Sequence, residues 1–378
     1  MNDSILSYLR EQGGVPFSEK PLGEVDALVL CQFSYLKFDG LVPGVDQMGN
    51  VVSLKELTMH PMWDGLFSDE RYEEANRELF QNMAESRRFG GLRLCAYVNL
   101  VEKDWEAQFS AITIFLESES PFVAFRGTDE TLIAWKEDFN MTFQSPIPAQ
   151  LCALKYLGEI ADRLGDSFFL GGHSKGGNLA VYAAMNCDAL IRGRIRTIYN
   201  MDGPGFWPEV REKSAYDEIA ERIVKILPRS SFIGMMFEQE NSYKVTESNN
   251  IGLLQHDPFS WVVRDGKFVE AADVSRGRKF IDETVNQWIL TFNRDQIREF
   301  IRVAFSVLEA SRKEDLIQIS EDKKKSFLEM ALAIKRLDAE EKRRLLEGIK
   351  RLFEMAGLNA LDKIDRLIQS LESELKKE

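Results

Sequence analysis

A serine flanked by glycines is the feature of this chain that most clearly predicts chemistry. Ser174 lies in Gly172-His173-Ser174-Lys175-Gly176, between the short apolar run 167–170 and the helix-like run 178–187. A strand, a sharp turn and a helix in that order hold a serine hydroxyl clear of a sheet, and the glycines tolerate the close backbone approach that the turn requires. We therefore predict that Ser174 is a nucleophile. The alternative is an ordinary glycine-rich turn that opens a helix.

A nucleophilic serine needs a base that takes its proton, and histidine is the usual choice. The chain has three histidines. His173 adjoins the nucleophile on the turn, where we expect it to point away and to support the turn by packing or hydrogen bonding. His60 precedes the serine, whereas His256 follows the strands and fits the order serine, acid, histidine. We predict that His256 is the base, although a lone histidine is often merely structural.

An acid must orient the imidazole and stabilise its protonated form. Of the carboxylates between the serine and His256, Asp202 opens Asp202-Gly-Pro-Gly205 just after a strand-like run. Catalytic groups of parallel sheets collect at such carboxyl ends of strands, whereas most other candidates fall on expected surface helices. Asp257 is too close to His256 in sequence to orient its ring easily. We predict that Asp202 is the acid, with a plain turn or helix-capping aspartate as the alternative.

Two backbone N–H groups are candidates for binding the oxyanion that forms on the substrate. One belongs to Lys175, at the start of the helix that follows the nucleophile. The other comes from the loop after an earlier strand, in Phe125-Arg126-Gly127-Thr128-Asp129. We choose Thr128, by its backbone N–H and its hydroxyl; an ordinary threonine in a turn is the alternative.

Alternating strand and helix patterns are expected to position these residues. Residues 1–88 predict helices and loops without a strand. Strand-like runs follow at 92–100, 109–116, 122–125, 167–170, 195–200 and 223–227, with helices expected at 131–142, 147–164, after Ser174 and at 208–221. This rhythm predicts a largely parallel sheet covered on both faces. Asp265-Gly266 between two apolar runs predicts a hairpin.

The chain beyond about residue 280 carries helical patterns only, at 297–310, 327–337 and 345–355. We therefore expect three parts: a helical N-terminal region packed on the core (1–88), an α/β core (89–290) and a helical C-terminal extension (291–378). The lysine runs 323–325 and 376–377 are expected to be solvated, with a binding patch as the alternative. The C-terminal helices are expected to pack on each other or on a protein partner, including a second copy of the chain.

Composition excludes several classes of function. With 378 residues, 44% hydrophobic and 29% charged, the chain is long enough for one large core and an appendage. A net charge of −13 argues against nucleic acid as a partner and against adsorption to anionic membranes. Its four cysteines, Cys31, Cys95, Cys152 and Cys187, are expected to be buried, reduced thiols, and no metal or organic cofactor is implied. Without a secretion signal or a transmembrane run, we expect a cytoplasmic protein.

Two motifs together resemble those of the class 3 lipases. Val123-Ala-Phe-Arg-Gly-Thr-Asp129 is similar to their oxyanion loop, and Gly171-Gly-His-Ser-Lys-Gly-Gly-Asn-Leu-Ala180 to the segment that carries their nucleophile. With Asp202-Gly-Pro-Gly-Phe206, Gln255-His256-Asp-Pro-Phe-Ser260 and Asp26-Ala-Leu-Val-Leu-Cys-Gln-Phe-Ser-Tyr35, the chain more closely resembles a bacterial lipase-like family of unknown function, from about residue 20 to about 310. The resemblance implies an α/β-hydrolase fold with Ser174 as nucleophile, and it supplies no substrate.

The chain departs from the lipase pattern at two places. Class 3 lipases usually place their acid after the next strand, but the matching stretch, Leu227-Pro-Arg-Ser-Ser-Phe-Ile-Gly234, has no carboxylate. Other α/β-hydrolases carry the acid one strand earlier, where Asp202 falls. Lys175 replaces a residue that is usually uncharged, so it either favours an anionic head group or the oxyanion, or extends to solvent without a role.

These observations predict a serine hydrolase that cleaves a carboxylic ester or thioester of a small molecule or lipid through an acyl-enzyme. The alternatives are a catalytically silent scaffold that presents its C-terminal helices to a protein partner, and an acyltransferase that uses the same residues. The apolar segments 59–63 and 235–237 are expected to line an acyl pocket, to form a lid or to belong to the core.

Overall fold

The computed structural model describes residues 3–68, 72–102, 107–128, 132–141, 144–229, 231, 233–238, 242–250, 252–271, 291–309 and 332–355. The chain divides by its contacts into two units. The first, which we call the sheet unit, comprises residues 1–101, 108–127 and 148–278; the second, the helical unit, comprises 102–107, 128–147 and 279–378. The part boundaries expected after residues 88 and 290 stay a prediction.

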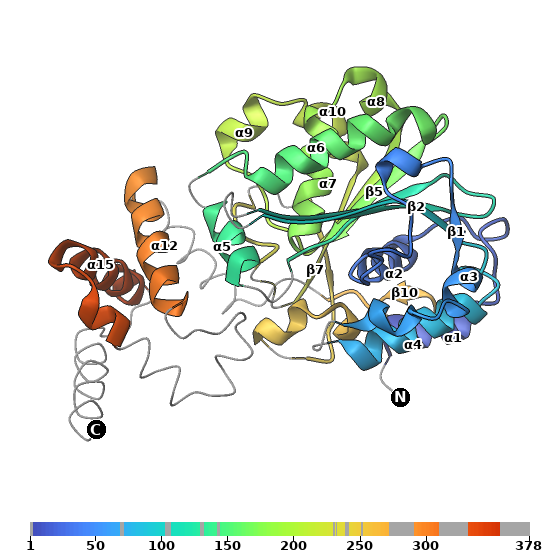
Figure 1. The fold of residues 1–378 in the computed structure, drawn as a ribbon, viewed down its shortest axis with the longest axis horizontal. Helices are drawn as coiled ribbons and strands as arrows, with labels where there is room; N and C mark the ends of the chain where they lie inside the picture. The colour runs from blue at the N-terminus through green and yellow to red at the C-terminus, as the bar shows by residue number, and fades with distance from the viewer. Residues whose placement is uncertain are drawn as a thin grey trace. The chain divides into compact units, whose positions relative to one another are not determined.

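An eight-stranded sheet forms the centre of the sheet unit, with its strands in sequence order (Figure 1). β1 pairs with β2, and β3 with β4, in antiparallel register, whereas β4 to β8 run parallel. The strands are β1 (Val52–Ser53), β2 (Arg93–Glu102), β3 (Ala107–Phe115), β4 (Phe122–Phe125), β5 (Phe168–His173), β6 (Ile195–Met201), β7 (Ile223–Pro228) and β8 (Lys244–Thr246). The parallel strands therefore end at one edge, where Ser174 and Asp202 follow β5 and β6.

Helices cover both faces of this sheet (Figure 1). One face carries α6 (Pro148–Ile160) and α7 (Lys175–Asn186), and the other carries α1 (Ile5–Gln12), α2 (Glu24–Phe33) and α4 (Glu73–Glu85). Shorter helices are α3 (Leu54–Thr58), α8 (Ala189–Arg194), α9 (Pro208–Glu212) and α10 (Tyr216–Ile219). The expected hairpin is β9 (Val263–Arg264) with β10 (Lys267–Phe268), and Asp265 and Gly266 have the positive φ values, 52° and 72°, that such a turn requires.

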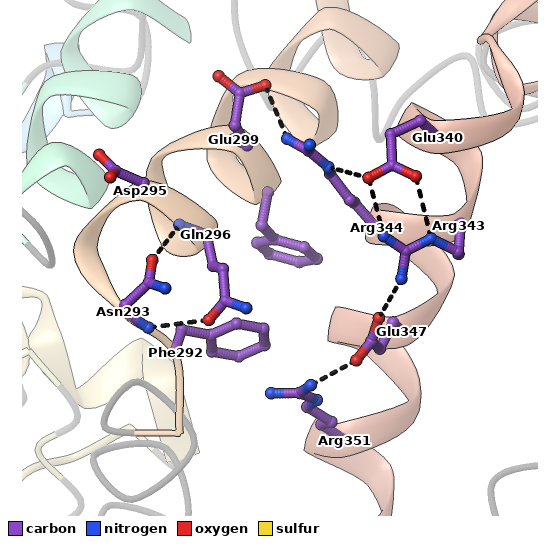
Figure 2. Close-up of a pocket in the computed structure, with 11 residues that line it drawn as sticks. Phe292, Asn293, Asp295, Gln296, Glu299, Glu340, Arg343, Arg344, Glu347 and Arg351 are labelled. Atoms are coloured by element: carbon purple, nitrogen blue, oxygen red, sulfur yellow. Dashed lines mark hydrogen bonds and ion pairs between the residues drawn. The ribbon is translucent and has the colours of Figure 1, made fainter.

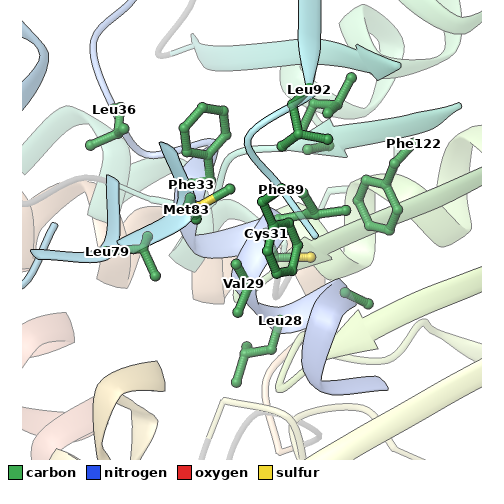
Figure 3. Close-up of a cluster of buried hydrophobic side chains, with 14 of the residues drawn as sticks. Leu28, Val29, Cys31, Phe33, Leu36, Leu79, Met83, Phe89, Leu92 and Phe122 are labelled. Carbon is green, nitrogen blue, oxygen red and sulfur yellow. The ribbon is translucent and has the colours of Figure 1, made fainter. Parts of the chain in front are cut away.

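Helix α2 is the buried centre of the face that the N-terminal helices cover. Every residue from Val25 to Phe33 is buried, as expected for an apolar run without a polar stripe. Figure 3 shows its side chains among those of α4 and the sheet. Asp26, at its first turn, accepts hydrogen bonds from Tyr8 and from Arg88, whose guanidinium forms a buried ion pair with it at 2.6 Å. The N-terminal helices are thus part of the core of the sheet unit.

The structure differs from the sequence-based expectation at α8, which was not predicted, and at the following elements. β1 lies in the region where no strand was expected, and β8 was not predicted; with two and three residues, both are too short for periodicity to signal. The single helix expected at 208–221 is instead α9 and α10. A turn at Ser214, whose N–H and hydroxyl both bond to the carbonyl of Arg211, separates them.

The helical unit contains α5 (Leu132–Asn140), α12 (Arg294–Glu309) and α15 (Ala339–Met355). Val303, Val307 and Leu345 form the apolar seam between α12 and α15. A cavity of about 300 Å³ lies beside this seam, and Figure 2 shows the network of arginines and glutamates along it. Hydrogen bonds from Arg343 and Arg344 lower the pKa of the Glu340 carboxyl to about 2.

Several predicted features lie outside the described residues. They include residues 327–331 of the helix expected at 327–337, of which the described residues 332–336 are helical, and both lysine runs, 323–325 and 376–377. Among the helices that the structure describes, none is long and apolar enough to cross a membrane.

Candidate active site

Ser174 lies on the sharp turn between β5 and α7 that the sequence predicted. Its backbone has φ 58° and ψ −132°, a conformation that non-glycine residues rarely adopt and that costs about 1–3 kcal/mol. The N–H of Ser174 donates to the carbonyl of Met201 at 2.9 Å, which ties the turn to the end of β6. The strain is therefore held in place by the neighbouring strand, as in sites where a nucleophile must stand clear of a sheet.

The glycines around Ser174 are required by close backbone packing. A β-carbon at Gly172 would lie 2.2 Å from the carbonyl carbon of Gly176, and one at Gly176 would lie 2.1 Å from the carbonyl oxygen of Phe125. No side chain fits at these distances. The start of α7 therefore packs directly on the ends of β4 and β5, and this packing positions the serine.

His256 and Asp202 meet at the same edge of the sheet. The Nδ1 atom of His256 lies 2.6 Å from Oδ2 of Asp202. The Asp202 side chain is fully buried, while that of His256 is 25% exposed. Since an ionised carboxylate only accepts, Nδ1 carries the hydrogen of this bond and Nε2 is the nitrogen left to act as a base. Asp202 also has a positive φ, 54°, and its N–H donates to the carbonyl of Ile226 at 2.9 Å.

Ser231 supports the carboxylate of Asp202 and was missed by the sequence analysis. Its hydroxyl makes a short hydrogen bond to Oδ1 of Asp202 and accepts the N–H of Gly234 at 3.1 Å. Because Gly234 is the donor in the second bond, the hydrogen of the Ser231 hydroxyl is directed at the carboxylate. The stretch after β7 that lacks a carboxylate thus supplies a hydroxyl to Asp202. A single serine after a strand gives no sequence signal for such a role.

His173 supports the loop that carries His256. Its Nε2 lies 2.9 Å from the carbonyl oxygen of His256, and the two rings are 4.5 Å apart. A carbonyl only accepts, so Nε2 of His173 is protonated, and in the neutral ring Nδ1 faces the hydroxyl of Tyr35 at 3.2 Å as an acceptor. The indole of Trp261 donates to the carbonyl of Gln255 at 2.9 Å. Hydrogen bonds to the neighbouring carbonyls of Gln255 and His256 thus hold the loop in place.

The role of His173 agrees in part with the expectation that it supports the turn by hydrogen bonding. His173 is 4% exposed, and its ring bonds to the His256 loop as well as to Tyr35, which is 8% exposed. Tyr35 was not singled out from the sequence, because a contact across 138 positions of the chain leaves no local pattern.

The loop after β4 reaches the nucleophile through Gly127. A β-carbon there would lie 2.1 Å from the hydroxyl oxygen of Tyr35 and 3.1 Å from Cβ of Ser174. Thr128 follows directly and belongs to the helical unit. Its hydroxyl makes a short hydrogen bond to the carboxylate of Asp138. Of the two groups expected to donate to the oxyanion, the backbone N–H is therefore the one that this bond does not occupy.

Lys175 does not extend to solvent. Its side chain is 1% exposed, and its ammonium donates to the carbonyl of Gln108 at 3.1 Å. The alternative in which Lys175 extends to solvent is therefore wrong, and a role of Lys175 in binding or catalysis stays a prediction. No hydrogen bond joins the Ser174 hydroxyl to His256 among the residues that the structure describes. Bonds between a nucleophile and its base are often long before substrate binds.

The two apolar segments lie in different settings. Met59 and Met62 are 68% and 58% exposed. Segment 235–237 packs against the turn that follows Asp202, where Gly205 N–H donates to the carbonyl of Met236 at 2.7 Å. A role of either segment in substrate binding stays a prediction. Within the described residues, no group of three or more His, Cys, Asp or Glu side chains is arranged to hold a metal ion.

Comparison with known proteins identifies a family and a distant similarity to a solved structure. The family model described as Mbeg1-like matches residues 83–306, a range that includes the three residues predicted to act as nucleophile, acid and base. The crystal structure of M37 lipase is similar at 15% identity over 57% of this chain and 70% of that chain, with a TM-score of 0.35. The comparison with curated proteins gives no match.

Proposed function

The chain belongs to the Mbeg1-like family, and we propose that it is a serine hydrolase that cleaves a carboxylic ester or thioester. Its mostly parallel sheet with helices on both faces agrees with the predicted α/β-hydrolase fold of the class 3 lipase-like type. The observation that carries the proposal is the 2.6 Å contact between His256 and the buried carboxylate of Asp202. A strained serine, at the end of the neighbouring strand of the same unit, supports it.

In the proposed reaction Ser174 attacks the carbonyl carbon while Nε2 of His256 takes the hydroxyl proton. Asp202 holds the ring through Nδ1 and stabilises the imidazolium that forms. The N–H groups of Lys175 and Thr128 are the proposed donors to the oxyanion. His256 then returns the proton to the leaving alcohol or thiol, and a water activated by the same ring hydrolyses the acyl-enzyme.

The catalytically silent scaffold is the weaker alternative. The absence of a carboxylate after β7 favours this alternative, but the carboxylate of Asp202 contacts His256 in its place and accepts a hydrogen bond from Ser231. Acyl transfer to an acceptor other than water would use the same residues. A cytoplasmic location, a small-molecule or lipid substrate, and a protein partner or self-association through the C-terminal helices stay predictions.

A series of 4-nitrophenyl esters with acyl chains of increasing length tests the proposal on the full-length chain. We expect turnover that Ser174→Ala abolishes and that Ser118→Ala, at an exposed turn, leaves intact. Adding a short alcohol as acceptor and analysing the products by mass spectrometry separates hydrolysis from transfer. A folded protein that turns over none of these esters faster than Ser174→Ala does would contradict the proposal.

A further inference from the structure

A second buried cation, Arg126, lies close in the chain to the residues that surround the nucleophile. It precedes Gly127, which packs against Ser174, and it is 2% exposed. Its Nη2 donates to Oδ1 of Asn99 at 2.9 Å. Its Nε and Nη1 are fully buried and have no hydrogen-bond partner in the part of the chain that the structure describes. Burying such donors without acceptors costs free energy, and folded proteins rarely leave buried donors without a partner.

Arg88 shows how the same fold pairs a buried guanidinium that has a structural role. It is also 2% exposed, and it donates to both oxygens of Asp26 at 2.7 and 2.6 Å. Three backbone carbonyls, those of Val15, Lys20 and Pro21, accept its remaining hydrogens. Arg88 is thus saturated and neutralised, whereas Arg126 has one neutral acceptor.

Asn99 separates Arg126 from the carboxylate of Asp39. Asn99 donates its amide hydrogens to the two oxygens of Asp39 at 3.1 and 3.0 Å and turns its own oxygen to Arg126. The amide therefore stands between the guanidinium and the carboxylate. Ser110 lies beside Arg126, and its carbonyl accepts the N–H of Arg126 at 2.9 Å. Among the described residues its buried hydroxyl makes no hydrogen bond of ordinary geometry and interacts only with the Tyr97 side chain.

We propose that Arg126, assisted by Ser110, binds an anionic oxygen group, a carboxylate or a phosphate, carried by the substrate. This inference deepens the proposed function and rests on it. Guanidinium groups bind such anions through short, charge-assisted hydrogen bonds. Nε and Nη1 point to opposite edges of the guanidinium plane, so an anion takes one of them together with the second hydrogen of Nη2, and the Ser110 hydroxyl is a further donor. Ser174 is also buried, with 5% of its surface exposed, so the proposed substrate has to enter the interior of the sheet unit to reach either residue. Lys175 is the poorer candidate, because its ammonium is already bound to Gln108.

Thermal unfolding of the full-length chain tests this site without any need for turnover. We expect sodium succinate or inorganic phosphate to raise the Tm of the wild type above its value in chloride at equal ionic strength. The anion that does so identifies the class. Arg126→Gln should abolish this shift and should not lower the Tm in chloride, because it removes a buried, unpaired charge. Arg88→Gln is the matched control, and it should lower the Tm because it leaves Asp26 unpaired.

A pair of substrates of equal length tests the site during catalysis. We compare a neutral 4-nitrophenyl ester with its analogue that ends in a carboxylate, and a phosphate-bearing analogue replaces the latter if phosphate gave the shift in Tm. The ratio of kcat/KM for the anionic over the neutral ester should fall about 10- to 100-fold in Arg126→Gln, as for the loss of hydrogen bonds to a charged group. Arg126→Lys, which keeps the charge but loses the fork, should fall in between. Arg264→Gln, at an exposed arginine, should leave the ratio unchanged.

Two outcomes would overturn the inference. One is an Arg126→Gln variant that loses Tm as strongly as Arg88→Gln does and keeps the wild-type substrate ratio, since Arg126 would then be structural. The other is a wild type whose Tm responds to neither anion. If no ester is turned over but the anion still raises the Tm through Arg126, the proposed hydrolase function fails while the anion site stands.

Discussion

Replacing Asp202 by asparagine is expected to leave the site intact in shape and inactive in function. Ser231 directs its hydrogen to Oδ1, because its oxygen already accepts the N–H of Gly234. In Asp202→Asn this bond therefore holds the amide oxygen toward Ser231 and turns the amide nitrogen toward Nδ1 of His256. A donor at that place forces Nδ1 to accept and moves the ring hydrogen to Nε2, which can then no longer take the proton of Ser174.

The expected loss follows from this exchange of tautomers. Where an asparagine replaces the acid of a serine–histidine–acid site, kcat falls by about 10⁴-fold, or ~5.5 kcal/mol of transition-state stabilisation. In Asp202→Asn the Ser231 hydroxyl bonds to a neutral amide oxygen, and such a bond is worth about 1 kcal/mol, against about 1.5–3 kcal/mol for a bond to a charged group. Ser231 therefore holds the amide in this orientation only moderately. Removing it in the double variant Asp202→Asn/Ser231→Ala should free the amide to rotate and should restore kcat by about tenfold, ~1.4 kcal/mol.

The assay is steady-state hydrolysis of the best ester found in the chain-length series, with folding checked by circular dichroism. Asp188→Asn is the matched control, because Asp188 caps the short helix α8 and lies outside the site. Its kcat should stay within about twofold of the wild type, as for surface substitutions. An Asp202→Asn variant within tenfold of the wild type, or a double variant slower than the single one, would refute this reasoning.

Three further predictions concern the surroundings of the site. Tyr35→Phe removes the hydroxyl that faces Nδ1 of His173, and kcat should fall about tenfold with little change in KM, as for one lost hydrogen bond; a rise in KM alone would contradict this. Gly127→Ala places a β-carbon 2.1 Å from the Tyr35 hydroxyl and should destabilise the fold by about 1–3 kcal/mol in urea unfolding, a cost that Tyr35→Phe should reduce; equal costs in both backgrounds would count against it. Burial raises the pKa of Cys95 and of Cys187 to about 11. At pH 8 iodoacetamide should therefore label these thiols at least tenfold more slowly in the folded than in the unfolded chain, measured by peptide mass spectrometry. Equal rates would contradict the burial of these thiols.

The sequence predicted those parts of the site that depend on local patterns. Ser174 could be located because a strand, a glycine-flanked turn and a helix are adjacent in the chain. Asp202 could be singled out because it follows a strand whose carboxyl end lies at the same edge of the sheet, and in the structure its carboxylate contacts His256. The main strands and helices followed from periodicity in the same way.

The supporting residues could not be predicted, because they depend on contacts across the fold. Ser231 and Tyr35 meet their partners across 29 and 138 positions of the chain, and nothing near either residue signals the contact. Neither the burial of Lys175 nor the unpaired nitrogens of Arg126 has a sequence signature, since each depends on which acceptors the folded chain brings near. Short strands such as β8 escape detection because three residues do not establish a period.

The measurement that tests the central claim most directly is intact-mass detection of a fluorophosphonate adduct on the purified protein. The probe forms a covalent bond with a serine whose hydroxyl is activated by a base. We predict one adduct on the wild type and none on Ser174→Ala or His256→Ala. A folded wild type that stays unlabelled, or a Ser174→Ala variant that is labelled as readily as the wild type, would contradict the account.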